Sequence, residues 1–185
     1  MNCKFDIVVA HDSNNGIGYA NELAWHLPED MAFFKQLTMG KHYEHKPNIV
    51  IMGRKTYESI PQAFRPLKNR INLVLTQSEF KVSNSNIITA ISIDDALFQA
   101  NTLIQSGDAN QIFCIGGKTI YEAMILNQYC RYLYVTVLDN EYQCDAFFPE
   151  YTQIFERLNC SEKQISTSGI TYQFQLWQSK QFKTN

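Results

Sequence analysis

The chain has 185 residues, of which 45% are hydrophobic and 18% are charged, a composition typical of a globular protein with a buried core. Its formal net charge of −2 excludes a general attraction to nucleic acid or to an anionic membrane, so an anionic ligand would need local basic groups. No apolar run is long enough to cross a membrane, and the N-terminus lacks the apolar core of a signal peptide, which makes a cytoplasmic location the expectation.

The cysteines and histidines predict neither a disulfide framework nor a metal site. The five cysteines are odd in number, widely spaced and without a Cys-x-x-Cys pair. His42 and His45 are three residues apart in a polar segment that contains no cysteine. We therefore expect free thiols, as in a reducing compartment, and no bound metal.

The order of apolar runs and helical segments predicts an α/β fold. Buried strands are expected at residues 5–10, 48–53, 70–76, 111–115 and 131–137, with a shorter strand at 86–88. Helices are expected at 28–37, 57–60, 92–107 and 118–124.

The last two expected strands, 154–160 and 170–177, have no helix between them and should form an antiparallel hairpin. Strand 170–177 alternates, which places Ile170, Tyr172, Phe174 and Leu176 on one buried face. We therefore expect a single domain over residues 1–185. Its central sheet would be twisted and mostly parallel, with about eight strands, helices on both faces and a C-terminal antiparallel hairpin.

The helix that begins at Pro28 carries an acid on its apolar face. Proline suits the first helical position, and Phe33, Phe34 and Leu37 recur at helical spacing. Asp30 precedes the two phenylalanines by three and four residues, so it points to the same face, where a carboxylate is costly unless it is hydrogen-bonded. Asp30 either favours the helix dipole or is a buried acid for a ligand with paired N–H donors, and this stretch alone leaves both readings open.

Residues 11–24 have turn chemistry and follow a strand, which is typical of a mobile lid. Within them Gly16-Ile17-Gly18 begins like a dinucleotide fingerprint, but Asn21 occupies the third glycine position and no helix begins there. The fingerprint is therefore not supported.

A basic turn, Arg54-Lys55, follows the strand 48–53, with Thr56 as a candidate helix cap. Two cations beside a helix start suit a phosphate group, and a solvated basic turn is the alternative. Thr136 similarly places a hydroxyl within possible reach of Asp30, although threonine in a strand can reflect β-propensity alone.

A double glycine, Gly116-Gly117, joins the strand 111–115 to the next helix. Gly117-Lys118-Thr119 suggests a phosphate loop, but Ile112 stands where that motif needs a glycine, so triphosphate hydrolysis is not supported. The turn either allows a pyrophosphate to approach the backbone or is an ordinary strand-to-helix connection.

Together these segments resemble dihydrofolate reductase, and the match covers nearly the whole chain. The matching segments are Gly16-Ile17-Gly18, Trp25-x-Leu27-Pro28-x-Asp30, Phe34-Lys35, residues 52–60, Arg65-Pro66-Leu67, Arg70, Ile115-Gly116-Gly117, Tyr121-Glu122, Tyr134-x-Thr136 and Phe148-Pro149. The resemblance implies hydride transfer from NADPH to 7,8-dihydrofolate, giving tetrahydrofolate for one-carbon metabolism and thymidylate synthesis. It also implies antifolate binding, a monomeric protein and a cis peptide between the two glycines.

The resemblance assigns a role to each matching site residue. Asp30, Trp25 and Thr136 would be catalytic, with the pKa of Asp30 raised by desolvation. The substrate would be bound by Leu27, Asp30, Phe34, Ile60, Leu67, Arg70, Ile115 and Thr136, with Arg70 on the glutamate carboxylate. The cofactor would be bound by Ala10, Ile17, Gly18, Gly53, Arg54, Lys55, Thr56, Thr76, Ser78, Ile115, Gly116, Gly117, Lys118, Thr119 and Tyr121. Of these, Arg54, Lys55, Thr76 and Ser78 would hold the 2′-phosphate.

The chain departs from the family pattern at several places. Leu23 and Ala24 replace a Met-Pro pair common in bacterial lids, Lys118 replaces a frequent third glycine, and a polar insert spans residues 40–46. Two other functions remain as alternatives. A pyrimidine reductase of riboflavin synthesis would share NADPH binding without needing Asp30, Phe34 and Arg70 together, and a non-catalytic nucleotide-binding module would need no buried acid.

Overall fold

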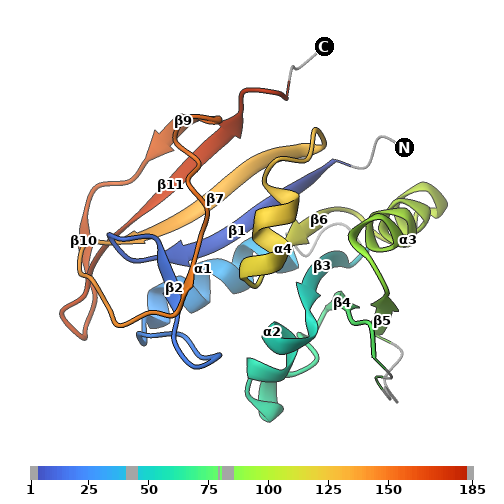
Figure 1. Cartoon of the computed structure of the whole chain (residues 1–185), viewed down its shortest axis with the longest axis horizontal. Helices are drawn as coiled ribbons and strands as arrows, with labels where there is room; N and C mark the ends of the chain where they lie inside the picture. The colour runs from blue at the N-terminus through green and yellow to red at the C-terminus, as the bar shows by residue number, and fades with distance from the viewer. Residues whose placement is uncertain (1–3, 41–45, 79, 81–85, 183–185) are drawn as a thin grey trace.

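A computed structural model describes residues 4–40, 46–78, 80 and 86–182; most of the 40–46 insert, including His42 and His45, and Cys3 lie outside these residues. In the described residues a nine-stranded sheet has the order β10-β11-β7-β1-β6-β3-β4-β5, with β9 also paired to β11 (Figure 1). Its strands are β1 (Phe5–His11), β3 (Asn48–Gly53), β4 (Arg70–Leu75), β5 (Ile87–Ala90), β6 (Ile112–Cys114), β7 (Cys130–Leu138), β9 (Phe155–Cys160), β10 (Gln164–Ile165) and β11 (Thr171–Ser179).

The strand directions confirm the predicted α/β class. The pairs from β7 through β1, β6, β3 and β4 to β5 are all parallel, and β11 is antiparallel to β7, β9 and β10. The helices are α1 (Pro28–Met39), α2 (Arg54–Ser59), α3 (Ile93–Ser106) and α4 (Lys118–Met124), with a short 3-10 turn, η1 (Gln62–Phe64). Two very short strands, β2 (Gly16–Gly18) and β8 (Ala146–Phe147), form a second sheet, and β2 lies within the segment 11–24 that was predicted to have turn chemistry.

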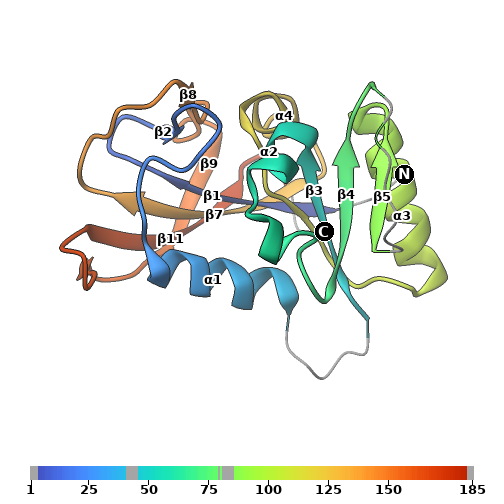
Figure 2. The ribbon, with the colours of Figure 1, turned by 90° about the horizontal axis from the view of Figure 1, so that it is seen from below.

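Both faces of the sheet are covered, which explains the continuous apolar runs of its strands. Side chains of β1 alternate between two cores: Ile7 and Val9 face the core that includes α3 and α4, and Val8 faces the core against which α1 packs. Figure 2 shows α1 and α4 on opposite faces of the sheet. The Pro28 helix is thereby held against the sheet.

α3 is the helix among α1 to α4 whose N-terminus has a side-chain cap in the described residues. Ser92 accepts a hydrogen bond from the backbone N–H of Asp95, and Gly107 ends α3 in the left-handed conformation, so both residues lie at the ends of the helix predicted over 92–107. Thr56 was a candidate cap, but α2 begins directly at Arg54 after the extended Gly53, which places Thr56 inside the helix. The predicted cap is therefore wrong.

The C-terminal hairpin is more irregular than simple alternation predicts. A register shift between Leu176 and Trp177 changes the pairing of β11 with β9. Tyr172 is buried as expected, but Gln175 is buried too, while Phe174 and Leu176 stay partly exposed. The burial of β11 therefore does not follow the simple alternation that the sequence predicts.

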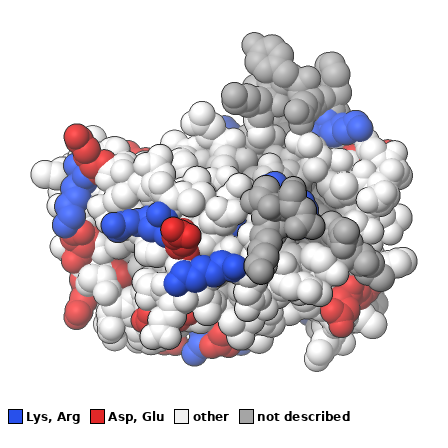
Figure 3. All heavy atoms as spheres, turned by 90° about the horizontal axis from the view of Figure 1, so that it is seen from above, with Lys and Arg blue, Asp and Glu red and all other residues white. Residues whose placement is uncertain are grey.

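Charged side chains are mixed on the face seen from above in Figure 3, where acidic and basic groups lie next to each other and most of the surface is uncharged. On this face the described residues form no continuous basic patch. Among residues 4–40, 46–78, 80 and 86–182, no helix is both long and apolar enough to span a bilayer. The same residues contain no group of three or more side chains arranged to hold a metal ion.

Candidate active site

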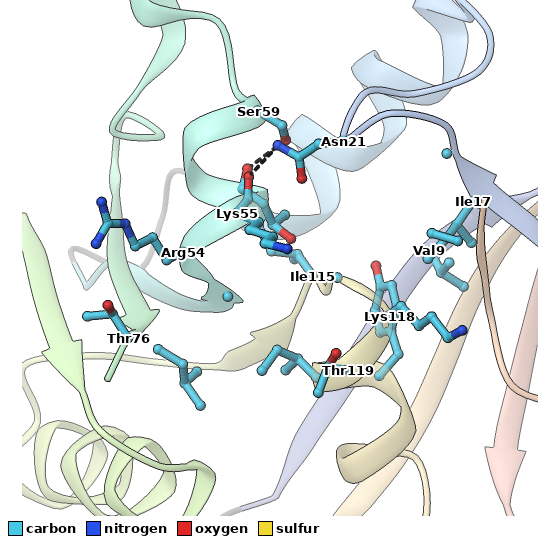
Figure 4. Close-up of a pocket in the computed structure, with 18 of the residues that line it drawn as sticks. Val9, Ile17, Asn21, Arg54, Lys55, Ser59, Thr76, Ile115, Lys118 and Thr119 are labelled. Atoms are coloured by element: carbon cyan, nitrogen blue, oxygen red, sulfur yellow. Dashed lines mark hydrogen bonds between the residues drawn. The ribbon is translucent and has the colours of Figure 1, made fainter. Parts of the chain in front are cut away.

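A cavity of about 990 Å³ opens where the carboxyl ends of the parallel strands meet the loops that follow them (Figure 4). This edge of an open α/β sheet is where ligands usually bind. The structure brings most of the predicted cofactor residues together there: Ala10, Ile17, Gly18, Gly53, Arg54, Lys55, Thr56, Thr76, Ile115, Gly117, Lys118, Thr119 and Tyr121. Segments far apart in the sequence therefore form one site.

Two predicted cofactor residues lie just behind this lining. Ser78 accepts a hydrogen bond of 2.7 Å from the Arg54 guanidinium, and the carbonyl of Gly116 accepts one of 2.8 Å from the Gly53 N–H. The lining also contains residues that were not predicted: Val9, Asn21, Glu22, Leu23, Ser59, Leu75, Gln77, Ile91, Ser92, Ile93, Ile120, Asp145 and Ala146. Residues 91–93 follow a predicted strand, and ligands of α/β sheets bind at the carboxyl ends of strands, so these three residues could have been predicted. Asp145 follows no predicted parallel strand, and the sequence gives no indication that it lines the cavity.

The basic turn is part of the cavity and is held in place by its neighbours. Arg54 forms an ion pair of 2.7 Å with Glu58 and lies 5.4 Å from the ring centre of Phe80. Lys118 begins α4, lines the same cavity and is 4.0 Å from Glu122. Cations from two elements thus line the cavity, which favours an anionic ligand over a merely solvated turn.

The double glycine leaves no room for side chains. Gly116 has a φ of +98°, and a Cβ atom there would lie 2.7 Å from the ring of Tyr121; a Cβ atom on Gly117 would lie 3.0 Å from Thr56 Oγ1. The Gly116–Gly117 peptide is cis. Tyr121 is buried and donates a hydrogen bond of 2.7 Å to the carbonyl of Val8, so the turn, α4 and β1 are packed closely together.

Asp30 is a buried acid next to this cavity. Only 9% of its surface is exposed, and its Oδ1 accepts a hydrogen bond of 2.6 Å from the hydroxyl of Thr136. Burial raises the pKa of Asp30 to about 6, and the Thr136 hydrogen bond partly opposes this rise. Thr136 is the register partner of Ala10, which lines the cavity, so the acid lies beside the ligand-binding edge.

A Thr136→Val variant should raise the pKa of Asp30 above about 6, because it loses the hydrogen bond that lowers this pKa. An NMR titration of the Asp30 carboxyl in the ligand-free protein measures the change. Thr136→Ser keeps the hydroxyl and is the matched control. An unchanged pKa in the valine variant would contradict the electrostatic part assigned to Thr136.

The other predicted site residues belong to two hydrophobic clusters. Trp25 and Leu27 are buried with Leu138 and Tyr172, and the indole Nε1 of Trp25 has no hydrogen-bond partner among the described residues. The second group packs on the core cluster that contains Val8 and consists of Phe34, Ile60, Leu67 and Ile115. Ile115 also lines the cavity, so this second group borders the cavity.

Arg70 is a buried cation at the far end of the second group. It donates a hydrogen bond of 2.7 Å to Thr38 Oγ1, and its guanidinium lies 5.7 Å from the ring centre of Phe34. Burial lowers the pKa of Arg70 to about 10. In the described part of the chain no carboxylate forms an ion pair with it, so the guanidinium is suited to an acidic ligand group.

Comparison with known proteins agrees with this geometry. The family model described as dihydrofolate reductase matches residues 4–179. The dihydrofolate reductase of Aedes albopictus is 30% identical over 180 residues, 95% of this chain and 97% of that protein. The Candida albicans dihydrofolate reductase is 35% identical over 190 residues, 94% of this chain and 96% of that protein.

A longer relative matches over part of its length. The bifunctional dihydrofolate reductase-thymidylate synthase 2 of Arabidopsis thaliana is 37% identical over 172 residues, which are 92% of this chain and 30% of that protein. The chain thus spans nearly all of the single-function relatives and about a third of the bifunctional one. With a family model that matches nearly its full length, the chain belongs to the dihydrofolate reductase family.

Proposed function

We propose that this chain catalyses the NADPH-dependent reduction of 7,8-dihydrofolate to 5,6,7,8-tetrahydrofolate, a reaction that serves one-carbon metabolism and thymidylate synthesis. The observation that carries the proposal is the buried carboxylate of Asp30, bonded to Thr136, beside a cavity lined by cations and a side-chain-free turn. A nucleotide-binding module has no need for such an acid. Membership of the family supports the same reaction.

The cavity residues fit NADPH. Arg54, with Ser78 bonded to its guanidinium, would hold the 2′-phosphate together with Lys55 and Thr76, while Lys118 would add a charge near the phosphates. Gly117 lines the cavity and has no side chain, which suits close approach of the cofactor to the backbone. The bound cofactor supplies the hydride, and the protein supplies position and electrostatics.

Asp30, Arg70 and the apolar residues of both groups fit the folate. The Asp30 carboxylate would accept two hydrogen bonds, from the amino group and the adjacent ring nitrogen of the pterin. Leu27, Phe34, Ile60, Leu67 and Ile115 would enclose the rings, and Arg70 would pair with the glutamate carboxylate. These apolar side chains exclude water and strengthen the electrostatic effect of the acid.

Proton supply follows from the same residues. The imine nitrogen of dihydropterin must gain a proton, and Asp30, with a pKa of about 6, would favour the protonated substrate near neutral pH. The unpartnered indole N–H of Trp25 would hold a water that delivers the proton. Asp30 would act by holding charge beside the substrate.

The direct test mixes the protein with NADPH and dihydrofolate and follows the loss of reduced-nicotinamide absorbance. Turnover that an antifolate inhibits is the expected result. NADPH oxidation with only the ribosylaminopyrimidine substrate of riboflavin synthesis would indicate the other reductase. NADPH binding without turnover of either substrate would indicate a binding module.

A further inference from the structure

Asp12, at the end of β1, is a buried carboxylate that has no part in the proposed chemistry. It is 1% exposed. Its Oδ1 accepts hydrogen bonds from the backbone N–H groups of Asn14 (2.9 Å) and Gly16 (2.7 Å). Its Oδ2 accepts one from the backbone N–H of Tyr142 (2.9 Å) and lies 3.9 Å from the thiol sulfur of Cys144. One side chain thus joins two loops that are 130 residues apart in the sequence.

These two loops form one wall of the cofactor cavity. Residues 17, 18 and 21–23 of the first loop line the cavity, as do Asp145 of the second loop and Ala146 of β8. β2 of the first loop pairs with β8, which follows the second. Farther along, Asn21 donates a hydrogen bond of 3.1 Å to the carbonyl of Lys55, so the first loop reaches α2 (Figure 4).

Packing around Asp12 leaves little freedom for the loops to shift. A Cβ atom on Gly16 would lie 2.6 Å from the sulfur of Cys144 and 2.9 Å from Asp12 Oδ2. The carboxylate of Asp145 also joins the loops, by accepting a hydrogen bond of 3.0 Å from the Ala20 N–H, but that bond is exposed to solvent. Backbone bonds join the loops as well, because the N–H groups of Ser13 and Asp145 donate to the carbonyls of Asn140 and Gly18. Asp12 adds to them a buried, charge-assisted connection that is shielded from solvent.

We infer that Asp12 is a positioning residue for the cofactor: its carboxylate fixes the two loops that make one wall of the cavity, and thereby maintains NADPH affinity. Backbone N–H groups donate to both Oδ1 and Oδ2, so both oxygens must be acceptors. An ionised carboxylate meets this requirement. The cofactor part of this inference rests on the proposed function. The loop connection itself stands on the geometry of the ligand-free protein.

The variant Asp12→Asn tests the inference, because an amide has an acceptor on one side only. Whichever way the amide turns, an NH₂ group faces a backbone N–H of one loop. In the ligand-free protein, amide hydrogen exchange at Tyr142 or at Gly16 should become roughly tenfold faster or more. The dissociation constant for NADPH should rise by a similar factor. Asp12→Ser, which is too short to reach Tyr142, should give the same two results and is a second variant if the first does not fold.

Asp6→Asn is the matched control. Asp6 is a fully buried carboxylate at the other end of β1, where it accepts a bond of 3.2 Å from the Tyr132 N–H and pairs with Arg131 at 2.8 Å. This variant should lower the melting temperature without changing NADPH affinity. A cofactor effect that follows stability alone would therefore appear in both variants.

Two results would overturn the inference. Exchange at Tyr142 and Gly16 that stays as in the wild type would show that Asp12 does not hold the loops. NADPH affinity no weaker in Asp12→Asn than in Asp6→Asn would show that the connection does not serve the cofactor. A wild-type protein that binds no NADPH at all would instead overturn the proposed function, and the cofactor part of the inference with it.

Discussion

Asp30→Asn is expected to slow hydride transfer to dihydrofolate by about 100-fold or more while leaving NADPH affinity nearly unchanged. The amide keeps the size of the side chain but cannot hold negative charge beside the substrate. Because the pKa of Asp30 is about 6, the wild type can favour protonated substrate near neutral pH, and the variant cannot. The deficit should therefore grow as the pH rises, which single-turnover measurements across this range report.

Asp30→Glu is the control, since it retains a carboxylate and should keep more activity than the amide. NADPH affinity, measured separately by fluorescence titration, tests whether the acid serves the substrate alone. An equal loss of cofactor binding and of hydride transfer would remove Asp30 from its assigned position.

Arg54→Ala should weaken NADPH binding by about 10- to 100-fold and change NADH binding little. The guanidinium lines the cavity, bonds to Ser78 at 2.7 Å and would contact the 2′-phosphate, which NADH lacks. Equilibrium titrations with both cofactors measure the difference. The loss should also shrink at high salt, because charge pairing is screened.

Arg65→Ala is the matched control for Arg54. Arg65 is a nearby cation, 5.8 Å from the ring centre of Tyr57, but it is not part of the cavity lining. Its removal should change neither affinity. Equal losses of NADPH and NADH binding in Arg54→Ala would place its contact elsewhere on the cofactor.

Elements with a strong local signal could be predicted from the sequence. β3 and α4 have the predicted bounds, since the first is buried on both faces and the second starts at a double glycine. β2 and β8 have three and two residues, which is too short for any periodicity. They form because two distant loops pair, and a single sequence gives no signal for that.

The site shows the same division between local and distant causes. Two of the contacts of Asp12 could be predicted from the sequence, because Asn14 and Gly16 are its near neighbours in a turn-forming segment. Its bond to Tyr142 depends on the tertiary structure. Likewise, helical spacing placed Asp30 on an apolar face, but the packing of α1 against the sheet is what brings Thr136 of β7 to it.

The buried acid also affects the folding equilibrium of the whole chain. Its carboxyl group ionises at about pH 6 in the folded protein but at an ordinary value of 3.8 when unfolded, so unfolding between these pH values releases a proton. The free energy of unfolding should therefore fall as the pH rises through this window, by at most roughly 3 kcal/mol, and Asp30→Asn should abolish that part of the decline. Denaturant titrations of both proteins at several pH values would measure the difference. Above this pH window the ionised carboxylate of Asp30, on which the proposed reaction depends, therefore lowers the stability of the fold.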